Sequence, residues 1–172
     1  MLGVIVNVLT VIIGSCIGLL FKRGIPQKVS TAAMIGLGAC TLYIGISGSL
    51  CGENVLIVIA SVVLGAISGT LLSIDEAINK LANTVETKFK KDGQNVSVAE
   101  GLVTATLLFC VGSMTVTGSI QAGLTGDNSV LITKATLDLV SSMMLASSLG
   151  IGVILASASV LVIQGGLVLL AG

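Results

Sequence analysis

The sequence predicts an all-α, polytopic helical membrane protein with six transmembrane helices. Of its 172 residues, 54% are hydrophobic and only 9% are charged, whereas soluble domains carry about a quarter charged residues. The mean hydropathy is +1.13, and the apolar residues gather in stretches of about 20, the length that crosses the hydrocarbon core of a bilayer. A lipid bilayer is therefore the expected partner of most of the surface.

Six apolar stretches are expected to form the transmembrane helices. They comprise residues 2–21, 31–50, 54–73, 98–117, 130–148 and 150–171. We treat the chain (1–172) as a single transmembrane domain. It has a first three-helix half (1–73), a connector (74–97) and a second three-helix half (98–172).

The connector at 74–97 predicts an amphipathic helix along the cytoplasmic face of the membrane. Its apolar residues recur at helical spacing between charged positions, and they are Ile74, Ile78, Leu81, Val85 and Phe89. Such a helix either anchors to the interface through its apolar stripe and lysines or binds a partner. The sequence leaves both roles open.

The basic residues predict how the spans are oriented in a bacterial plasma (inner) membrane. Seven of the eight lie in the connections 22–30 and 74–97, and cytoplasmic loops of membrane proteins are enriched in lysine and arginine. We therefore expect both connections in the cytoplasm and the N-terminus outside. Spans one to three would then begin outside and spans four to six inside, as in an inverted 3+3 repeat.

Pairs of glycines four residues apart predict faces on which helices pack closely. Such small-xxx-small faces let two backbones approach each other. The pairs are Gly14 with Gly18 in the first span and Gly65 with Gly69 in the third. The same faces would allow subunits to associate as a homo-oligomer.

Composition disfavours several classes of function. The net charge is zero, so no nucleic acid partner is expected, because binding a phosphate backbone requires a basic surface. There is no histidine, and the four cysteines are scattered without a CxxC spacing. We therefore expect no metal, no cofactor and no catalytic residue.

Lys134 and Asp138 are the leading candidates for a functional site. They are opposite charges well inside a predicted span, four residues apart, and they share a polar helix face with Ser141 and Ser142. A charge that faces lipid costs roughly 2.5–3.5 kcal/mol on insertion scales, so this face should turn toward protein or water. It either forms part of a transport path or only fixes the helix, and Lys134 lies close enough to the outer end to snorkel.

The end of the fourth span predicts a broken helix. Glycine and hydroxyl residues alternate there, with Ser113, Thr115 and Thr117, and broken helices of this kind line substrate or ion cavities in transporters. An ordinary helix end at the interface is the alternative. Residues 118–129 follow as an external loop or a re-entrant segment, in which Asp127 either caps the fifth helix or belongs to the path.

Asn7 and Glu100 are further polar candidates for the path. Asn7 lies within the first span and Glu100 near the start of the fourth. The alternative roles are a hydrogen bond to a neighbouring helix for Asn7 and a favourable interaction with a helix dipole for Glu100.

Several segments together resemble a known family of bacterial membrane proteins, the domain of unknown function 554. The likeness covers essentially the whole chain and rests on residues 3–7 (GVIVN), 99–101 (AEG), 107–114 (LLFCVGSM), 123–127 (GLTGD) and 148–153 (SLGIGV). It implies a cytoplasmic-membrane protein that looks like a small transporter or channel, with no established substrate. The residues that match polar positions of the family pattern are Asn7, Glu100, Ser113, Asp127, Lys134 and Asp138. Family members usually continue past the position of Gly172, which implies a short or truncated member.

Together these features predict a transporter or channel for a small solute or ion. The path candidates are Asp138, Lys134, Ser113, Thr115, Thr117, Asp127, Asn7, Glu100, Ser141 and Ser142. The alternative is a non-transporting membrane scaffold or regulator, in which the same polar groups only hold helices together. An intramembrane enzyme is disfavoured, because Asp138 has no second intramembrane carboxylate on its helix.

Overall fold

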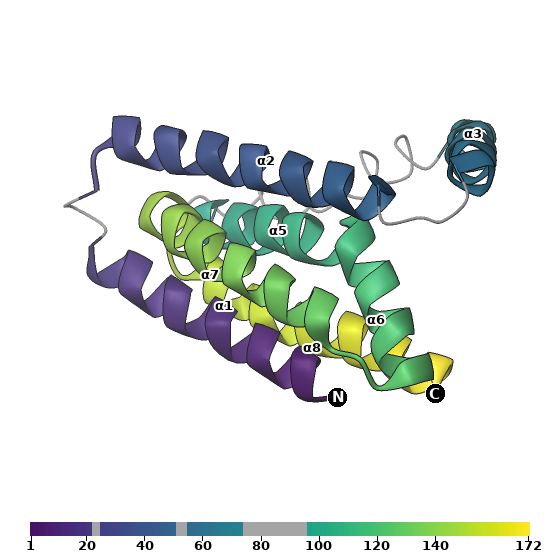
Figure 1. The fold of residues 1–172 in the computed structure, drawn as a ribbon. Coiled ribbons are helices and arrows are strands. Elements are labelled where there is room, and N and C mark those ends of the chain that lie inside the picture. The colour runs from purple at the N-terminus through teal and green to yellow at the C-terminus, as the bar shows by residue number, and fades with distance from the viewer. Residues whose placement is uncertain (22–24, 51–54, 74–95) are drawn as a thin grey trace.

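The structure, a computed structural model, describes residues 1–21, 25–50, 55–73 and 96–172. All regular secondary structure in these residues is helical, as Figure 1 shows. The helices are α1 (Leu2–Leu20), α2 (Gln27–Leu50), α3 (Val55–Leu71), α5 (Val96–Cys110), α6 (Ser113–Thr125), α7 (Ser129–Leu149) and α8 (Gly152–Ala171). The all-α prediction is confirmed.

The predicted number of six spans is not confirmed. Four of the described helices, α1, α2, α7 and α8, are long and apolar enough to cross a membrane, and the bent pair α5–α6 would make a fifth. The predicted span 54–73 contains only the 17 residues of α3, which is seen end-on in Figure 1 whereas the other helices are seen from the side. The predicted amphipathic connector 74–97 lies outside the described residues, except that its last two positions belong to α5.

The backbones of α1 and α7 lie in close contact, and α1 contacts α7 more extensively than any other helix. A Cβ atom at Gly14 would lie 2.3 Å from the backbone oxygen of Leu139, and one at Gly18 would lie 2.2 Å from that of Met143. Larger side chains at these two positions would push the helices apart. A Cβ atom at Gly65 or Gly69 of α3 would meet nothing within 4 Å.

The chain bends sharply between α5 and α6, by 55°. Gly112 is extended at the start of α6, with φ −61° and ψ 145°. The buried Thr115 hydroxyl donates to the backbone oxygen of Phe109, 2.8 Å away. A hydroxyl of α6 thus satisfies a carbonyl that the end of α5 leaves without a helical partner.

Beyond the bend the chain is helical again, although the alternating glycine and hydroxyl residues were expected to disfavour a regular helix there, and most of the segment 118–129 is helix and not loop. Ser113–Thr125 is helical, and only residues 126–128 separate it from α7. Threonine hydroxyls donate to backbone oxygens four residues earlier, Thr117 to Ser113 and Thr125 to Gln121. Because these bonds lie within the helix, the hydroxyl residues are compatible with helical structure.

The core lies where α1, α5, α7 and α8 meet. Its buried apolar residues are Val11, Ala105, Phe109, Cys110, Ala146, Val153, Ala156 and Val160. Gly152 lets the start of α8 approach α5, since a Cβ atom there would lie 1.9 Å from the backbone oxygen of Val98. α8 therefore runs beside α5 from its first turn and continues past α6.

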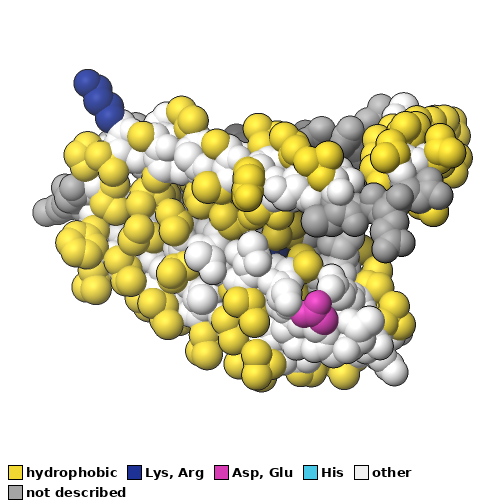
Figure 2. All heavy atoms as spheres, viewed as in Figure 1, with side chains coloured by type: hydrophobic (Ala, Val, Ile, Leu, Met, Phe, Trp, Pro, Cys, Tyr) yellow, Lys and Arg dark blue, Asp and Glu magenta, His cyan; other side chains and the backbone are white. Residues whose placement is uncertain are grey.

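The outside of the molecule is largely apolar. Figure 2 shows apolar side chains over much of one face, with a basic side chain at the start of α2 and an acidic one beside the loop between α6 and α7. α3 has no buried residue, and most of the large apolar side chains of α2 are exposed. An apolar belt with charges at its ends is the surface expected of a protein in a bilayer.

An inverted repeat is not confirmed, because the two predicted halves differ. In the first half α1 is continuous, whereas its counterpart in the second half is divided into α5 and α6. The third helix of the first half, α3, has no buried residue, whereas α8 buries eight residues.

Candidate functional site

A buried ion pair lies in the middle of α7. The Lys134 ammonium donates a hydrogen bond to Oδ2 of Asp138, one helical turn later. Their exposed fractions are 4% and 6%. The prediction that this helix face turns away from lipid is confirmed, and the Lys134 side chain pairs inside the protein instead of snorkelling outward.

Phe109 is a second neighbour of the Lys134 ammonium. Lys134 Nζ lies 5.9 Å from the centroid of the Phe109 ring, within the range of a cation–π interaction. Phe109 is fully buried near the end of α5. The lysine therefore touches the α5–α6 junction as well as its own helix.

The ion pair forms part of the wall of a cavity of about 330 Å³. This volume is at the lower end of the range for small-molecule sites. The cavity lies between α2, the α5–α6 junction and α7, and its lining consists of Met34, Leu37, Gly38, Thr41, Leu108, Gly112, Ser113, Met114, Lys134, Leu137, Asp138 and Ser141. It thus combines an aliphatic wall with two charged groups and the first residues of a helix.

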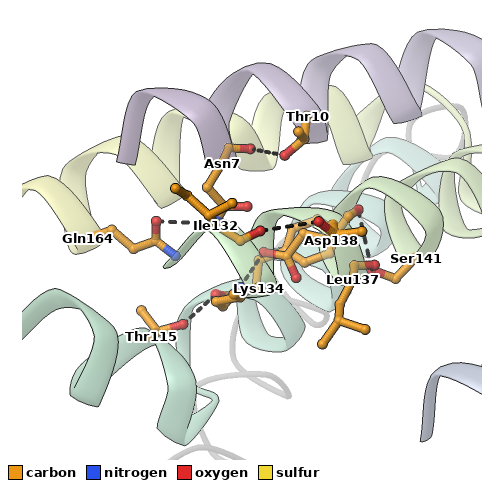
Figure 3. Close-up of polar contacts among 11 residues, drawn as sticks. Asn7, Thr10, Thr115, Ile132, Lys134, Leu137, Asp138, Ser141 and Gln164 are labelled. Carbon is orange, nitrogen blue, oxygen red and sulfur yellow. Dashed lines mark hydrogen bonds and ion pairs between the residues drawn. The ribbon is translucent and has the colours of Figure 1, made fainter. Parts of the chain in front are cut away.

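A buried amide pair, Asn7 of α1 and Gln164 of α8, lies near the ion pair, as Figure 3 shows. Asn7 Nδ2 donates to Gln164 Oε1 over 3.1 Å, and both side chains are fully buried. Asn7 Oδ1 and Gln164 Nε2 have no hydrogen-bond partner, nor does the hydroxyl of Ser119. Unpaired polar atoms in a protein interior are uncommon and suggest that water or another polar group binds there.

The structure brings only part of the predicted set together. Lys134, Asp138, Ser113 and Ser141 line the cavity. The Ser141 hydroxyl also donates to the backbone oxygen of Leu137, 2.9 Å away.

Two further candidates are buried outside the cavity lining: Thr115 at the helix break and Asn7 in the amide pair. Ser142 is buried at the contact with α1, where its hydroxyl would obstruct a Cβ atom at Gly14.

Thr117, Asp127 and Glu100 are exposed and lie outside the site. Glu100 lies in α5, beside the C-terminal end of α7, since the adjacent Gly101 approaches Leu149. Eleven residues of helix separate Leu149 from Asp138, which corresponds to about 16 Å. Glu100 is therefore far from the ion pair.

Asp127 has a capping role in the loop between α6 and α7. Its Oδ1 accepts hydrogen bonds from the backbone N–H, over 2.9 Å, and the hydroxyl of Ser129. Its Oδ2 accepts a bond from Gln121 Nε2 over 2.7 Å. The bonds from Ser129 hold the pKa of Asp127 below its ordinary value. The Asp127 carboxylate thus bonds to the first residue of α7, whereas the N-cap residue Asn128 makes no side-chain cap bond to that helix.

Asn128 links the same loop to α1 by a hydrogen bond. Its Oδ1 accepts the Gly3 N–H at 3.0 Å, and its Nδ2 donates to the backbone oxygen of Gly126. Asn128 therefore caps the start of α1 instead of its own helix, a role that the sequence did not indicate.

Three site residues were missed by the sequence analysis. Gln164 is the only amide in the last predicted span, which has no charged residue, and that isolation was a usable signal. Thr41 lines the cavity from α2, and Phe109 touches Lys134; neither has a distinctive pattern. Among the described residues, no three histidine, cysteine, aspartate or glutamate side chains could together hold a metal ion.

The fold and this site define an α-helical membrane protein with a charged pair in the wall of a partly open cavity. Residues 2–172 match the family described as "Protein of unknown function (DUF554)". The chain belongs to that family.

Two curated relatives carry names that specify no activity. The chain is 34% identical to the uncharacterized membrane protein YdfK of Bacillus subtilis (strain 168), over 99% of this chain and 73% of the relative. It is 28% identical to the uncharacterized protein YqgA of Escherichia coli (strain K12), over 95% of this chain and 71% of the relative. No solved structure matches the chain significantly.

Proposed function

We propose that this protein is a membrane transporter or channel for a small solute or ion, and that the cavity beside Lys134 and Asp138 is its binding site. The supporting observation is the position of the ion pair. Two charges buried among apolar helices are costly, and this pair lines a partly open cavity of about 330 Å³. Ionisable residues at such positions commonly mark substrate or ion pathways.

The bend beside the cavity supports the same function. Gly112, Ser113 and Met114 line the cavity at the start of α6, where the chain bends by 55°. In transporters, half-helices that end near the middle of the membrane direct their backbone groups at the solute.

Flux through reconstituted liposomes tests the proposal. Purified protein is screened with H⁺, Na⁺, K⁺ and Cl⁻ indicators and with radiolabelled amino acids, amines and carboxylates. Asp138→Asn should abolish the flux that the wild type supports, because it removes one of the two charges in the cavity. Glu100→Gln is the matched control, since this exposed carboxylate of α5 lies near the end of α7, which is about 16 Å from Asp138, and its flux should stay at the wild-type level.

Two results would contradict the proposal. Wild-type flux in a folded Asp138→Asn variant would remove the site assignment. Absence of flux for every probe in the wild type, with correct insertion, would favour the alternative of a non-transporting scaffold. We also propose a non-enzymatic role, because Asp138 is the only buried carboxylate in the described part of the chain.

The scaffold alternative makes a distinct prediction about the ion pair. If the pair only holds the fold, the double variant Lys134→Met/Asp138→Leu, which leaves no unpaired charge, should retain every activity of the protein in vivo. If the cavity is a solute site, the same variant should fold and lose flux.

We further propose a plasma-membrane topology with the N-terminus outside. The end of α1 and the start of α5 both lie where α7 ends, since Gly18 approaches Met143 and Val98 approaches Gly152. The connection 22–30 therefore begins, and the connection 74–97 ends, at the same end of the bundle. In a variant without native cysteines, Lys28→Cys should be protected from an impermeant maleimide in intact cells, whereas Ser129→Cys should react; the reverse pattern would overturn the orientation.

A further inference from the structure

The cavity has an unusual charge pattern for a solute site. Lys134 and Asp138 both line it, and they are the only buried charges among the described residues. Their charges cancel, so the site as a whole is close to neutral. The rest of the wall is mainly aliphatic, with Met34, Leu37, Leu108, Met114 and Leu137.

The start of α6 adds partial positive charge at one side of this cavity. Its cap residue, Gly112, offers no side-chain acceptor, and Gly112 and Ser113 both line the cavity. The first N–H groups of a helix have no partner within the helix and interact favourably with anions. Lys134 faces the same junction of α5 and α6, since its ammonium lies 5.9 Å from the centroid of the Phe109 ring.

Neither a simple cation nor a simple anion suits this arrangement. A cation drawn to Asp138 would be repelled by Lys134, and an anion drawn to Lys134 would be repelled by Asp138. In a site of low dielectric constant these repulsions are strong. A solute that carries both charges a few bonds apart meets an opposite charge at each end.

We propose that the cavity binds a zwitterion with an apolar body, of the class of aliphatic α-amino acids. Its carboxylate would bind Lys134 and the start of α6, its ammonium would bind Asp138, and its side chain would contact the aliphatic wall. The inference rests on the proposed transport function but concerns binding, which is measured without flux.

Three matched probes test the charge requirement with the full chain in lipid nanodiscs. L-leucine carries both charges, 3-methylbutylamine carries only the ammonium, and 4-methylpentanoate carries only the carboxylate. Isothermal titration calorimetry should show L-leucine binding about 10- to 100-fold tighter than either half-probe, the effect of one charge-assisted hydrogen bond. Equal binding of a half-probe, or no binding of L-leucine, overturns the proposal.

Charge-removing variants should reverse this selectivity. Lys134→Met leaves the Asp138 carboxylate unpaired, so the amine should bind better than L-leucine. Asp138→Leu leaves the Lys134 ammonium, so the carboxylate should become the preferred probe. Unchanged selectivity in variants that still fold would show that the ion pair does not contact the solute.

Filling the cavity supplies a test that leaves both charges in place. Gly38 lines the cavity, whereas Gly36 is not among the lining residues, and a Cβ atom at either position would meet nothing within 4 Å. Gly38→Leu should therefore reduce L-leucine binding at least about tenfold, while Gly36→Leu should leave it unchanged. Equal effects of the two variants would place the binding site elsewhere.

Binding and flux together separate this inference from the proposed function. Flux of an inorganic ion without L-leucine binding would contradict the zwitterion and preserve transport. L-leucine binding without flux of any probe would contradict transport and preserve the zwitterion.

Discussion

The bundle of α1 and α5–α8 and the outer pair α2 and α3 have similar composition but different packing. Both regions are rich in aliphatic residues and glycine. Gly14 and Gly18 lie directly against α7, whereas Gly36, Gly45 and Gly65 of the outer pair meet nothing. A small residue permits close contact between helices, but it does not by itself identify the helices that make it.

The polar side chains distinguish the bundle from the outer pair more clearly than the glycines do. In α2 and α3, Thr41, Ser49 and Thr70 donate to backbone oxygens of their own helix four residues earlier. In the bundle, Asn7 bonds to Gln164 of another helix. Lipid tolerates a hydroxyl bonded within its helix, but an amide or a charge requires a protein or water partner. Strongly polar side chains therefore mark the helices that pack together.

The largest expected effect is loss of one member of the ion pair. Lys134→Met leaves the Asp138 charge buried without its partner and should lower the free energy of unfolding by about 3–5 kcal/mol. In the outer pair, Lys28 is exposed, so Lys28→Met should leave stability unchanged. Unfolding in mixed micelles measures both variants, and equal stability would show that the buried charge is already compensated by water.

Adding a single methyl group to each region should give the next largest effect. Gly14→Ala places a Cβ atom 2.2 Å from the Ser142 hydroxyl oxygen and 2.3 Å from a backbone oxygen, so it should destabilise by about 1–3 kcal/mol. Gly65→Ala places its methyl group in open space and should raise helix stability by up to about 1 kcal/mol. If both variants are equally stable, α1 and α7 do not pack as described.

The hydrogen bond between the α6–α7 loop and α1 should contribute less to stability than the ion pair or the close packing at Gly14. Asn128→Ala removes the acceptor of the Gly3 N–H, 3.0 Å away, and should destabilise by about 1 kcal/mol, as loss of a helix cap usually does. Asn128→Asp keeps the acceptor and should retain most of the stability. Thermal unfolding of the two variants side by side distinguishes the cap from a general effect on the loop.

The sequence predicted the positions of individual helices better than their assembly. The expected spans 2–21 and 130–148 differ from α1 and α7 by one residue at each altered end, because apolar length and flanking polar residues are local signals. The break after Cys110 could be predicted only to within several residues, since serine and threonine occur both at helix interruptions and within regular helices. The placement of α3 was not predictable, because this helix has no buried residue that would mark the face it packs with.

The candidate site was partly predictable for the same reason. Lys134 and Asp138 were identified because charge within an apolar span is rare. Thr41 was not identified, because it lines the cavity only through the way α2 lies beside α7. Asp127 and Glu100 are equally charged but are exposed near the ends of helices, so their charge does not mark a buried site.

The smallest effect should come from Asp127, which is exposed in the loop at the end of the bundle. Its pKa is lowered, chiefly by the hydrogen bonds from Ser129, so the folded protein favours the carboxylate form more than the unfolded chain does. The resulting stabilisation is complete above the unfolded pKa of about 4 and is lost as the pH falls through the folded pKa. Asp127→Asn should therefore remove a small acid-dependent loss of stability and leave stability near pH 7 slightly lower than in the wild type. Because solvent screens this exposed group, the change in the acid unfolding curve should be small. A large change would mean that Asp127 has a buried partner in the membrane-embedded protein. The polar contacts of the bundle would then extend from its buried helices to its loops.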